Sequence, residues 1–329
     1  MRSQLAPVTL SGIQRTVRPE LELVLGELRR IIAADFPLIG DVNQHLLRMK
    51  GKMFRPTLVL LSAQATGRIG PREVTLGAVA ELIHLATLVH DDSVDHSVLR
   101  RGQPTINALF SHQVAVIMGD YLYSRAIVEL VDGNDLEPLR VMARVTNDMT
   151  VGEMRELEAH DALEYSEEEY DRLIRAKTAS LMSGACELGA LSAGPSVREA
   201  LRRYGMFLGM AFQITDDLLD YTGSQSVTGK PTGQDLREHK VTLPLIAALR
   251  RMAPGERRVV AQLMADAPPT DDLIESVVDV VETRGGLASA RERAQQLTLQ
   301  AEAELDALPP GEALDALRDC LVYAVERRS

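Results

Sequence analysis

Three segments of the chain, residues 74–90, 113–131 and 205–219, are apolar on nearly every side when they are placed on a helix. A helix without a polar face is stable in water only when other elements surround it. No run of the sequence shows the period of two that a half-buried strand requires, and no hairpin is expected. The chain is therefore predicted to be all-α, with these three helices inside a large bundle and further helices wrapped around them.

Helical patterns continue through most of the remaining sequence. Ser166 precedes three glutamates, as in a capping box, and prolines 71, 104 and 138 fall near expected helix starts. The composition shows no break, so one domain over residues 1–329 is predicted. The expected helices are 18–34, 54–66, 71–96, 104–131, 135–161, 166–191, 196–221, 240–251, 270–283, 286–307 and 311–327.

Charge and cysteine content restrict the possible partners. The net charge of −11 argues against nucleic acid as the main partner, and two cysteines in 329 residues provide no disulfide framework. The most apolar stretch, residues 76–89, is broken by Glu81 and His84 and is too short to span a bilayer. The N-terminus shows no signal-peptide pattern. A cytoplasmic protein without a membrane span is expected.

The pattern DDxxD occurs twice, and its six carboxylates are those of Asp91, Asp92, Asp95, Asp216, Asp217 and Asp220. Helical residues are about 100° apart, so each motif gathers three carboxylates on one face at the end of an apolar helix. Like charges repel there, and the carboxyl end of a helix disfavours anions. A hard divalent cation such as Mg²⁺ would offset both effects. A solvated acidic helix end, or a zinc site at His90 and His96, is the alternative.

Basic side chains accompany these motifs. Lys52 and Arg55 lie at the start of a predicted helix, where backbone N–H groups also favour anions. His84 precedes the first acidic motif by almost two helical turns and shares its face. The Gly-rich loop 223–233 follows the second motif, carries Lys230 and is expected to close as a lid over a bound phosphate. Each is alone typical of a surface charge, but together they supply the local cations that an acidic chain needs to bind an anion.

The chain carries, in order, GKMFRP, ELIHLATLVHDDSVD, RRGQPT, MGDYLYSRA, KTA, FQITDDLLDYTG and GKPTGQDLREHKVTLP. This series, from Gly51 to Arg328, resembles the trans-isoprenyl diphosphate synthases, or polyprenyl synthetases. The resemblance implies an isoprenoid synthase-type helical bundle with central helices around a deep apolar cavity, usually a homodimer. It implies head-to-tail (1'-4) condensation of isopentenyl diphosphate with an allylic diphosphate, giving an all-trans polyprenyl diphosphate. It also implies three Mg²⁺ ions per active site, with Mn²⁺ able to substitute.

The resemblance assigns roles residue by residue. The six aspartates are expected to bind metal. The isopentenyl diphosphate site is expected at Lys52, Arg55, His84 and Arg101. The allylic diphosphate is expected at Arg100, Lys177, Thr178, Gln213 and Lys230. Catalytic roles are assigned to Asp91, Asp92, Asp95, Asp216, Asp217, Lys177 and Lys230. The terminal Arg327 and Arg328 resemble a basic tail that helps to close the site.

Product length is expected to depend on residues just before the first acidic motif, where bulky side chains in this family block the growing chain. Ala86 and Thr87 occupy these positions and are small. An open apolar shaft and a medium- to long-chain product, which could be released to membranes, are therefore predicted. The floor of the shaft is expected on the next helix, at Met118, Tyr121, Leu122 and Tyr123.

Three other interpretations remain open. The first is a short-chain synthase that makes geranylgeranyl or farnesyl diphosphate. A non-catalytic subunit of a heteromeric synthase would tend to lack an intact acidic motif, whereas both are complete here. A terpene cyclase or a squalene-type enzyme would not need the GKMFRP cluster.

Overall fold

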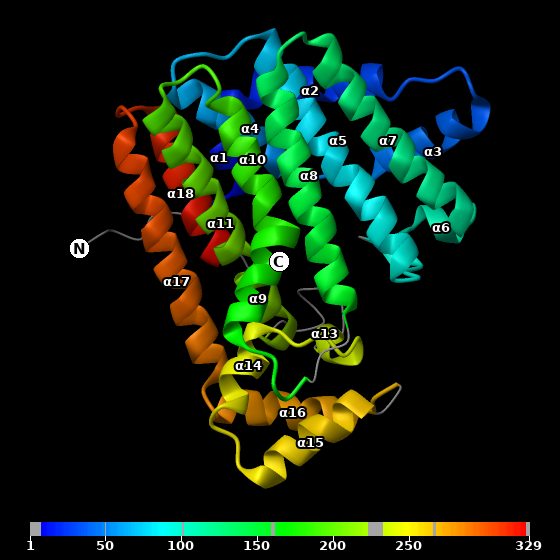
Figure 1. The fold of residues 1–329 in the computed structure, drawn as a ribbon, viewed down its shortest axis with the longest axis vertical. Helices are drawn as coiled ribbons and strands as arrows, with labels where there is room; N and C mark the ends of the chain where they lie inside the picture. Colours follow the sequence, from blue (N-terminus) through cyan, green and yellow to red (C-terminus); the bar gives the residue numbers. More distant parts are fainter. Residues whose placement is uncertain are drawn as a thin grey trace. The chain divides into compact units, whose positions relative to one another are not determined.

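The computed structural model describes residues 8–49, 51–100, 102–158, 162–222, 233–265 and 268–326 (Figure 1). Its regular structure is almost entirely helical, which confirms the all-α prediction. Contacts divide the chain into two compact units. Unit 1 comprises Met1–Val145, Gly184–Arg202 and Ala307–Leu317, and unit 2 comprises Thr146–Ser183, Arg203–Asp306 and Arg318–Ser329. The single domain over residues 1–329 stays a prediction.

Unit 1 is built around a long apolar helix, α5. Its elements are α1 (Leu10–Ile13), the 3₁₀ helix η1 (Gln14–Val17), α2 (Arg18–Ile31), α3 (Pro37–Arg48), α4 (Phe54–Ala65), α5 (Pro71–Val94), β1 (Leu99–Arg100), β2 (Gln103–Pro104), α6 (Ile106–Leu109) and α7 (His112–Asp132). Helices α4 and α7 pack beside α5, and α2 packs against it as well. By length and composition α5 could span a bilayer, but 67% of its most apolar window is buried, as in a core helix.

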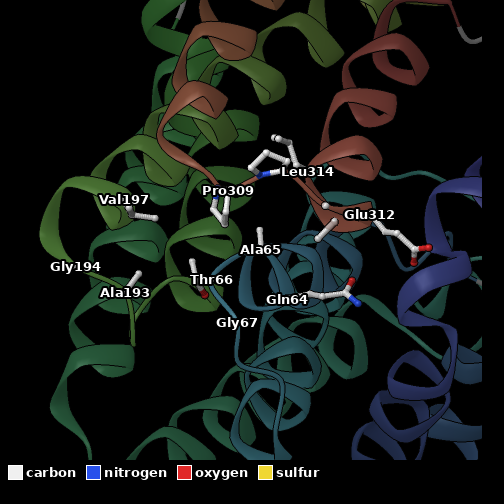
Figure 2. A pocket seen from close by; sticks show the side chains of 13 residues that line it. Gln64, Ala65, Thr66, Gly67, Ala193, Gly194, Val197, Pro309, Glu312 and Leu314 are labelled. Carbon is white, nitrogen blue, oxygen red and sulfur yellow. The ribbon is translucent and has the colours of Figure 1, made fainter.

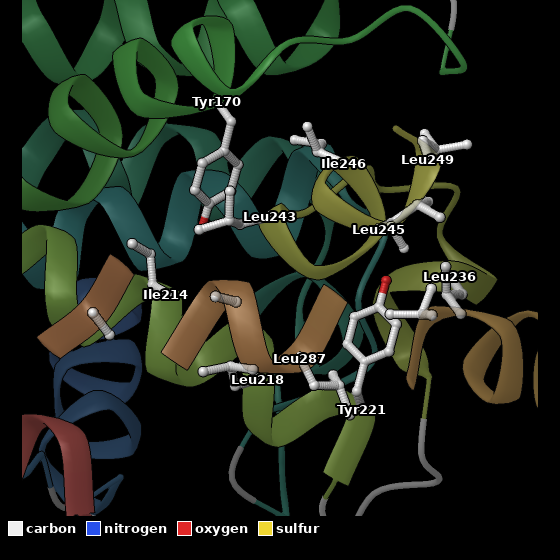
Figure 3. Close-up of a cluster of buried hydrophobic side chains, with 14 of the residues drawn as sticks. Tyr170, Ile214, Leu218, Tyr221, Leu236, Leu243, Leu245, Ile246, Leu249 and Leu287 are labelled. Atoms are coloured by element: carbon white, nitrogen blue, oxygen red, sulfur yellow. The ribbon is translucent and has the colours of Figure 1, made fainter. Parts of the chain in front are cut away.

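Unit 2 is built around an apolar core of its own. Its elements, some shared with unit 1, are α8 (Leu136–Leu157), α9 (Glu167–Ile174), the π-helix η2 (Arg175–Ala179), α10 (Ser180–Gly189), α11 (Pro195–Thr222), α13 (Gln234–Arg237), α14 (Leu243–Leu249), α15 (Pro254–Ala265), α16 (Asp271–Thr283), α17 (Gly286–Glu304), the 3₁₀ helix η3 (Leu305–Ala307) and α18 (Glu312–Glu326). Figure 3 shows Ile214 and Leu218 of α11 gathered with Leu243, Ile246 and Leu287 in its core.

The observed elements differ from the predicted ones in several places. Helices α3 and α15 were not predicted; each begins at a proline and is rich in polar residues. The expected helix 104–131 is broken, because Phe110 and Ser111 have extended or irregular backbone angles between α6 and α7. The prediction that the chain has no hairpin was also wrong, since β1 and β2 form a two-residue antiparallel ladder. Gly102, with a φ of 74°, makes the tight turn between them.

Candidate active site

The first acidic motif lies at the carboxyl end of α5, as predicted. Val94 is the last helical residue, and the N–H of Asp95 donates to the carbonyl oxygen of Asp91 at 2.8 Å. Asp91 is partly buried and Asp95 is exposed, whereas Asp92 is only 4% exposed. Two carboxylates of this motif are thus accessible to a ligand, and the middle one is part of the protein interior.

Arg100 lies beside this motif. The hairpin turn at Gly102 places Arg100 on β1, where its Nε–H donates to Asp92 Oδ1 at 2.8 Å and to Oδ2 at 2.9 Å. This pair compensates the charge of a buried carboxylate that would otherwise be costly. Arg101, expected to bind isopentenyl diphosphate, lies outside the described residues.

Histidines around this helix end have separate partners. His90 Nε2 is 3.2 Å from the carbonyl oxygen of Val116, and a Cβ atom at Gly119 would lie 2.2 Å from the same nitrogen. A side chain at position 119 would therefore displace the His90 ring from this place. His96 faces His112 instead, with 3.2 Å between Nδ1 and Nε2. The divergence of His90 and His96 does not favour the zinc alternative.

The GKMFRP turn forms the entrance to α4. Met53 is held in the left-handed region, with a φ of 52°, which is uncommon for a residue with a side chain. Gln14 supports the turn by donating its Nε2–H to the carbonyl oxygen of Lys52 at 2.9 Å. Lys52 is exposed and Arg55 is partly buried in the first turn of α4. The two cations therefore stand at a helix N-terminus, as an anion site requires.

Helix α5 carries the expected chain-length residues below the first motif. Ala86 is 2% exposed, while His84 and Thr87 are partly buried. The hydroxyl of Thr87 donates to the carbonyl oxygen of His84 at 2.8 Å, so its hydrogen-bonding capacity is turned back onto the helix. On α7, Met118 and Leu122 are buried.

The two tyrosines of the expected floor differ from these apolar residues. The phenol of Tyr121 donates to the carbonyl oxygens of Ile32 and Ala33, at 3.1 and 3.3 Å, and so contacts the end of α2. Tyr123 is 36% exposed. Met118 and Leu122 are therefore the buried members of the predicted floor.

The second acidic motif lies in the last two turns of α11. Asp216 is exposed, Asp217 is 4% exposed and Asp220 is partly buried. Both oxygens of Asp220 accept backbone N–H groups at 3.0 Å, one from Gln234 and one from Asp235. Asp220 therefore ties the end of α11 to α13, and Asp216 is the most accessible carboxylate of this motif.

Asp217 is held by a chain of hydrogen bonds. Gln213 Nε2 donates to Asp217 Oδ1 at 2.8 Å, and Thr178 Oγ1 donates to Gln213 Oε1 at 2.9 Å. The hydroxyl of the fully buried Tyr170 donates to Asp217 Oδ2 at 2.5 Å. Burial raises the pKa of Asp217 to about 7, although both hydrogen bonds act in the opposite direction. Thr178 and Gln213, predicted together, do lie together.

Three residues near this motif were missed from the sequence. Tyr170 is one of them. Asp235 is another: burial, together with the nearby charges of Asp217 and Asp220, raises its pKa to about 8. Lys240 is the third, and it is charged beside Asp235 and Glu238. The last two stand within the GKPTGQDLREHKVTLP motif, which could have pointed to them.

Lys177 occupies a π-helix in unit 2. Its Nζ lies 3.1 Å from Glu153 Oε2 and also pairs with Glu156. A Cβ at Gly152 would lie 2.7 Å from the backbone nitrogen of Lys177, and one at Gly209 would lie 2.6 Å from Cα of Ala179. Two glycines therefore let α8 and α11 approach the π-helix backbone closely. Such helical irregularities are frequent at functional sites.

A cavity of about 620 Å³ in unit 1 contains none of the predicted site residues (Figure 2). It is lined by the end of α4, the α10–α11 turn and the loop before α18. The predicted Lys230, Arg327 and Arg328 lie outside the described residues, so their roles stay predictions.

The donors of both motifs fit a hard divalent cation. Asp91, Asp95 and Asp216 offer carboxylate oxygens that are at least partly accessible. Among the described residues no group of three His, Cys, Asp or Glu side chains forms a ready metal cage. Mg²⁺ usually takes one or two carboxylates and completes its shell with phosphate oxygens and water, so an open set of carboxylates suits it.

Comparisons with known proteins agree with this chemistry. The polyprenyl synthetase family model matches residues 36–281. An all-trans-nonaprenyl-diphosphate synthase (geranyl-diphosphate specific) of Rhodobacter capsulatus is 38% identical over 90% of this chain and 91% of that protein. The octaprenyl diphosphate synthase of Escherichia coli (strain K12) is 36% identical over 97% of this chain and 99% of that protein.

Among solved structures, a polyprenyl synthase from Caulobacter crescentus CB15, complexed with calcium and isoprenyl diphosphate, matches with a TM-score of 0.92. Its sequence is 32% identical, and the match covers 99% of this chain and 100% of that one. The chain belongs to the polyprenyl synthetase family.

Proposed function

We propose that this metal-dependent trans-prenyl diphosphate synthase adds isopentenyl diphosphate units to an allylic diphosphate and makes a medium- to long-chain product. The observation that carries the proposal is the pair of complete acidic motifs, each at the end of an apolar helix and each with accessible carboxylates. The names of the nonaprenyl and octaprenyl relatives support the product class.

Mg²⁺ would be held by Asp91 on α5, by Asp95 just after α5 and by Asp216 on α11, with three ions per active site and Mn²⁺ able to substitute. When bound, it would neutralise charge that develops on the leaving diphosphate. Asp92 and Asp217 would support metal binding from the protein interior. Each carboxylate is buried and accepts hydrogen bonds from protein donors. Asp220 holds α13 and completes the second motif.

Lys177, Thr178 and Arg100 bind the allylic diphosphate, together with Gln213 and Lys230. Lys177 pairs with Glu153 and Glu156, and these ion pairs orient its ammonium group. Lys52, Arg55 and His84, with Arg101, bind isopentenyl diphosphate at the start of α4. Separate cationic sites for the two diphosphates allow both substrates to be held at once in a strongly acidic chain.

The allylic C–O bond breaks and its electron pair leaves with the diphosphate. The double bond of isopentenyl diphosphate supplies the electrons of the new C–C bond, and one proton passes to the released diphosphate. Cationic side chains stabilise the departing anion, and the apolar walls of α5 and α7 exclude water that would otherwise quench the carbocation.

The product length follows from the small residues Ala86 and Thr87, which leave room below the first motif, with Met118 and Leu122 as part of the floor. We also propose a homodimer. On α7, Ile117, Val128 and Val131 lie on one helical face and are 65%, 41% and 54% exposed. An apolar stripe of this kind is typical of an interface between subunits. A cytoplasmic location is proposed for the same enzyme.

The test is steady-state turnover with Mg²⁺, farnesyl diphosphate and labelled isopentenyl diphosphate. Asp91→Ala should lower turnover by orders of magnitude while circular dichroism stays unchanged, because it removes a metal-binding carboxylate. Asp272→Ala, at an exposed aspartate in the first turn of α16, is the matched control. Near-normal turnover of Asp91→Ala would overturn the metal assignment.

A further inference from the structure

Tyr170 is a buried tyrosine for which the proposed function gives no role. It lies in the middle of α9 and is 1% exposed. Figure 3 shows its ring inside the apolar cluster, near Ile214 and Leu243. A phenylalanine would fill the same space, so packing does not explain the hydroxyl.

The partner of this hydroxyl is the central carboxylate of the second acidic motif. Tyr170 Oη donates to Asp217 Oδ2 at 2.5 Å across 47 residues of sequence. Bonds between a hydroxyl and a carboxylate are among the short, strong hydrogen bonds of proteins. The phenol is rigid and buried, so it fixes the position of this oxygen to within a narrow range.

The other oxygen of Asp217 is fixed independently. Gln213, one helical turn earlier on α11, donates to Oδ1 at 2.8 Å and receives a hydrogen bond from Thr178. The carboxylate therefore accepts one hydrogen bond from α9, through Tyr170, and one from its own helix, through Gln213. Asp216 precedes Asp217 directly, so a rigid Asp217 also restrains the exposed metal-binding carboxylate beside it.

We propose that Tyr170 is a positioning residue of the second acidic motif, acting through Asp217 to hold Asp216 in the geometry that binds the metal. The inference rests on the proposed function. Groups that orient metal ligands typically contribute 10–100-fold to metal affinity or activity, so loss of the hydroxyl is expected to act on metal binding rather than on folding alone.

The experiment compares Tyr170→Phe with Tyr221→Phe in the full-length protein. Tyr221 is the next residue after the motif, its phenol is buried in the same cluster, and within the described residues it makes no hydrogen bond to a motif carboxylate. Two readouts are taken: the Mg²⁺ concentration that gives half-maximal turnover, and the Mg²⁺ concentration that gives half of the metal-induced rise in Tm without substrate.

Tyr170→Phe is expected to raise both Mg²⁺ concentrations about tenfold or more, and Tyr221→Phe to leave both unchanged. In an Asp217→Asn background, Tyr170→Phe should add no further shift, because the two residues act as one unit. An unchanged Mg²⁺ requirement, an equal shift for Tyr221→Phe, or an additive shift in the Asp217→Asn background would each overturn the inference. Wild-type protein with no Mg²⁺-dependent synthesis would instead contradict the proposed function.

Discussion

The Nε–H of Arg100 donates to both carboxylate oxygens of Asp92. Arg100 lies on β1, shortly after the end of α5, and Asp92 is the middle aspartate of the first acidic motif. The side chain of Asp92 is 6% exposed and that of Arg100 is 30% exposed. The pair thus joins the hairpin of β1 and β2 to the end of α5, and it neutralises a carboxylate that solvent barely reaches.

Replacing Arg100 should therefore reduce stability as well as activity. Arg100→Ala leaves Asp92 buried without its partner, at a cost of about 1–3 kcal/mol in the free energy of unfolding. Urea denaturation measures this change. Arg291→Ala, at an exposed arginine of α17, is the control and should lie within about 0.5 kcal/mol of wild type. Equal stability of the two variants would show that the pair contributes little.

Product length should respond to the size of residue 87. Thr87→Phe places a ring one turn below Asp91, so the product ladder on a chromatogram should end at a shorter chain. Ala86→Phe should shorten the ladder as well, but Ala86 is buried and the added volume should also lower the Tm. Thr75→Phe is the matched control, since Thr75 is a partly buried threonine of α5 whose hydroxyl also donates to a backbone carbonyl of its own helix, that of Pro71. A ladder unchanged by Thr87→Phe would mean that the chain grows elsewhere.

Gly152 should tolerate no side chain. A Cβ at this position would lie 2.7 Å from the backbone nitrogen of Lys177, so Gly152→Ala must displace the π-helix. The expected result is a raised KM for the allylic diphosphate together with a lower Tm. Gly26→Ala, in the middle of α2 with open space around it, should instead keep KM and raise stability by roughly 0.5–1 kcal/mol. A normal KM for Gly152→Ala would show that the position of the π-helix does not affect binding of the allylic diphosphate.

The pH dependence of stability should reveal the buried Asp217. Its ordinary pKa is 3.8, and burial raises the pKa in the folded state to about 7. Between these values the unfolded chain has lost a proton that the folded protein keeps, so stability falls as pH rises from about 4 to 7. Urea midpoints in EDTA should show this decline, and Asp217→Asn should make it shallower. An identical pH profile for both proteins would contradict the assignment.

The acidic motifs and their helices could be predicted because their signals are local. Residues 74–90 of α5 and residues 205–219 of α11 are apolar on nearly every side, and the carboxylates of each motif have the spacing of one helical face. Thr178 and Gln213 were placed together through the family resemblance, and the hydrogen bond between them agrees with that placement.

Other features depend on contacts between distant segments. Tyr170 and Asp217 are 47 residues apart, and nothing in the sequence around Tyr170 distinguishes it from a core tyrosine. The role of Gly152 appears only when α8 meets the π-helix. Asp235 was within a recognised motif, but its burial beside Asp217 and Asp220 comes from the fold of α13 against α11.

The most direct test of the central claim is a product analysis of the purified protein alone. The protein would be incubated with Mg²⁺, farnesyl diphosphate and labelled isopentenyl diphosphate, and the dephosphorylated products separated by length. A ladder that ends at one chain length beyond geranylgeranyl is the predicted result. Products that stop at geranylgeranyl, after a single addition, would contradict the open shaft. No elongation by folded protein with several allylic primers would contradict a catalytic role and favour a partner-dependent subunit.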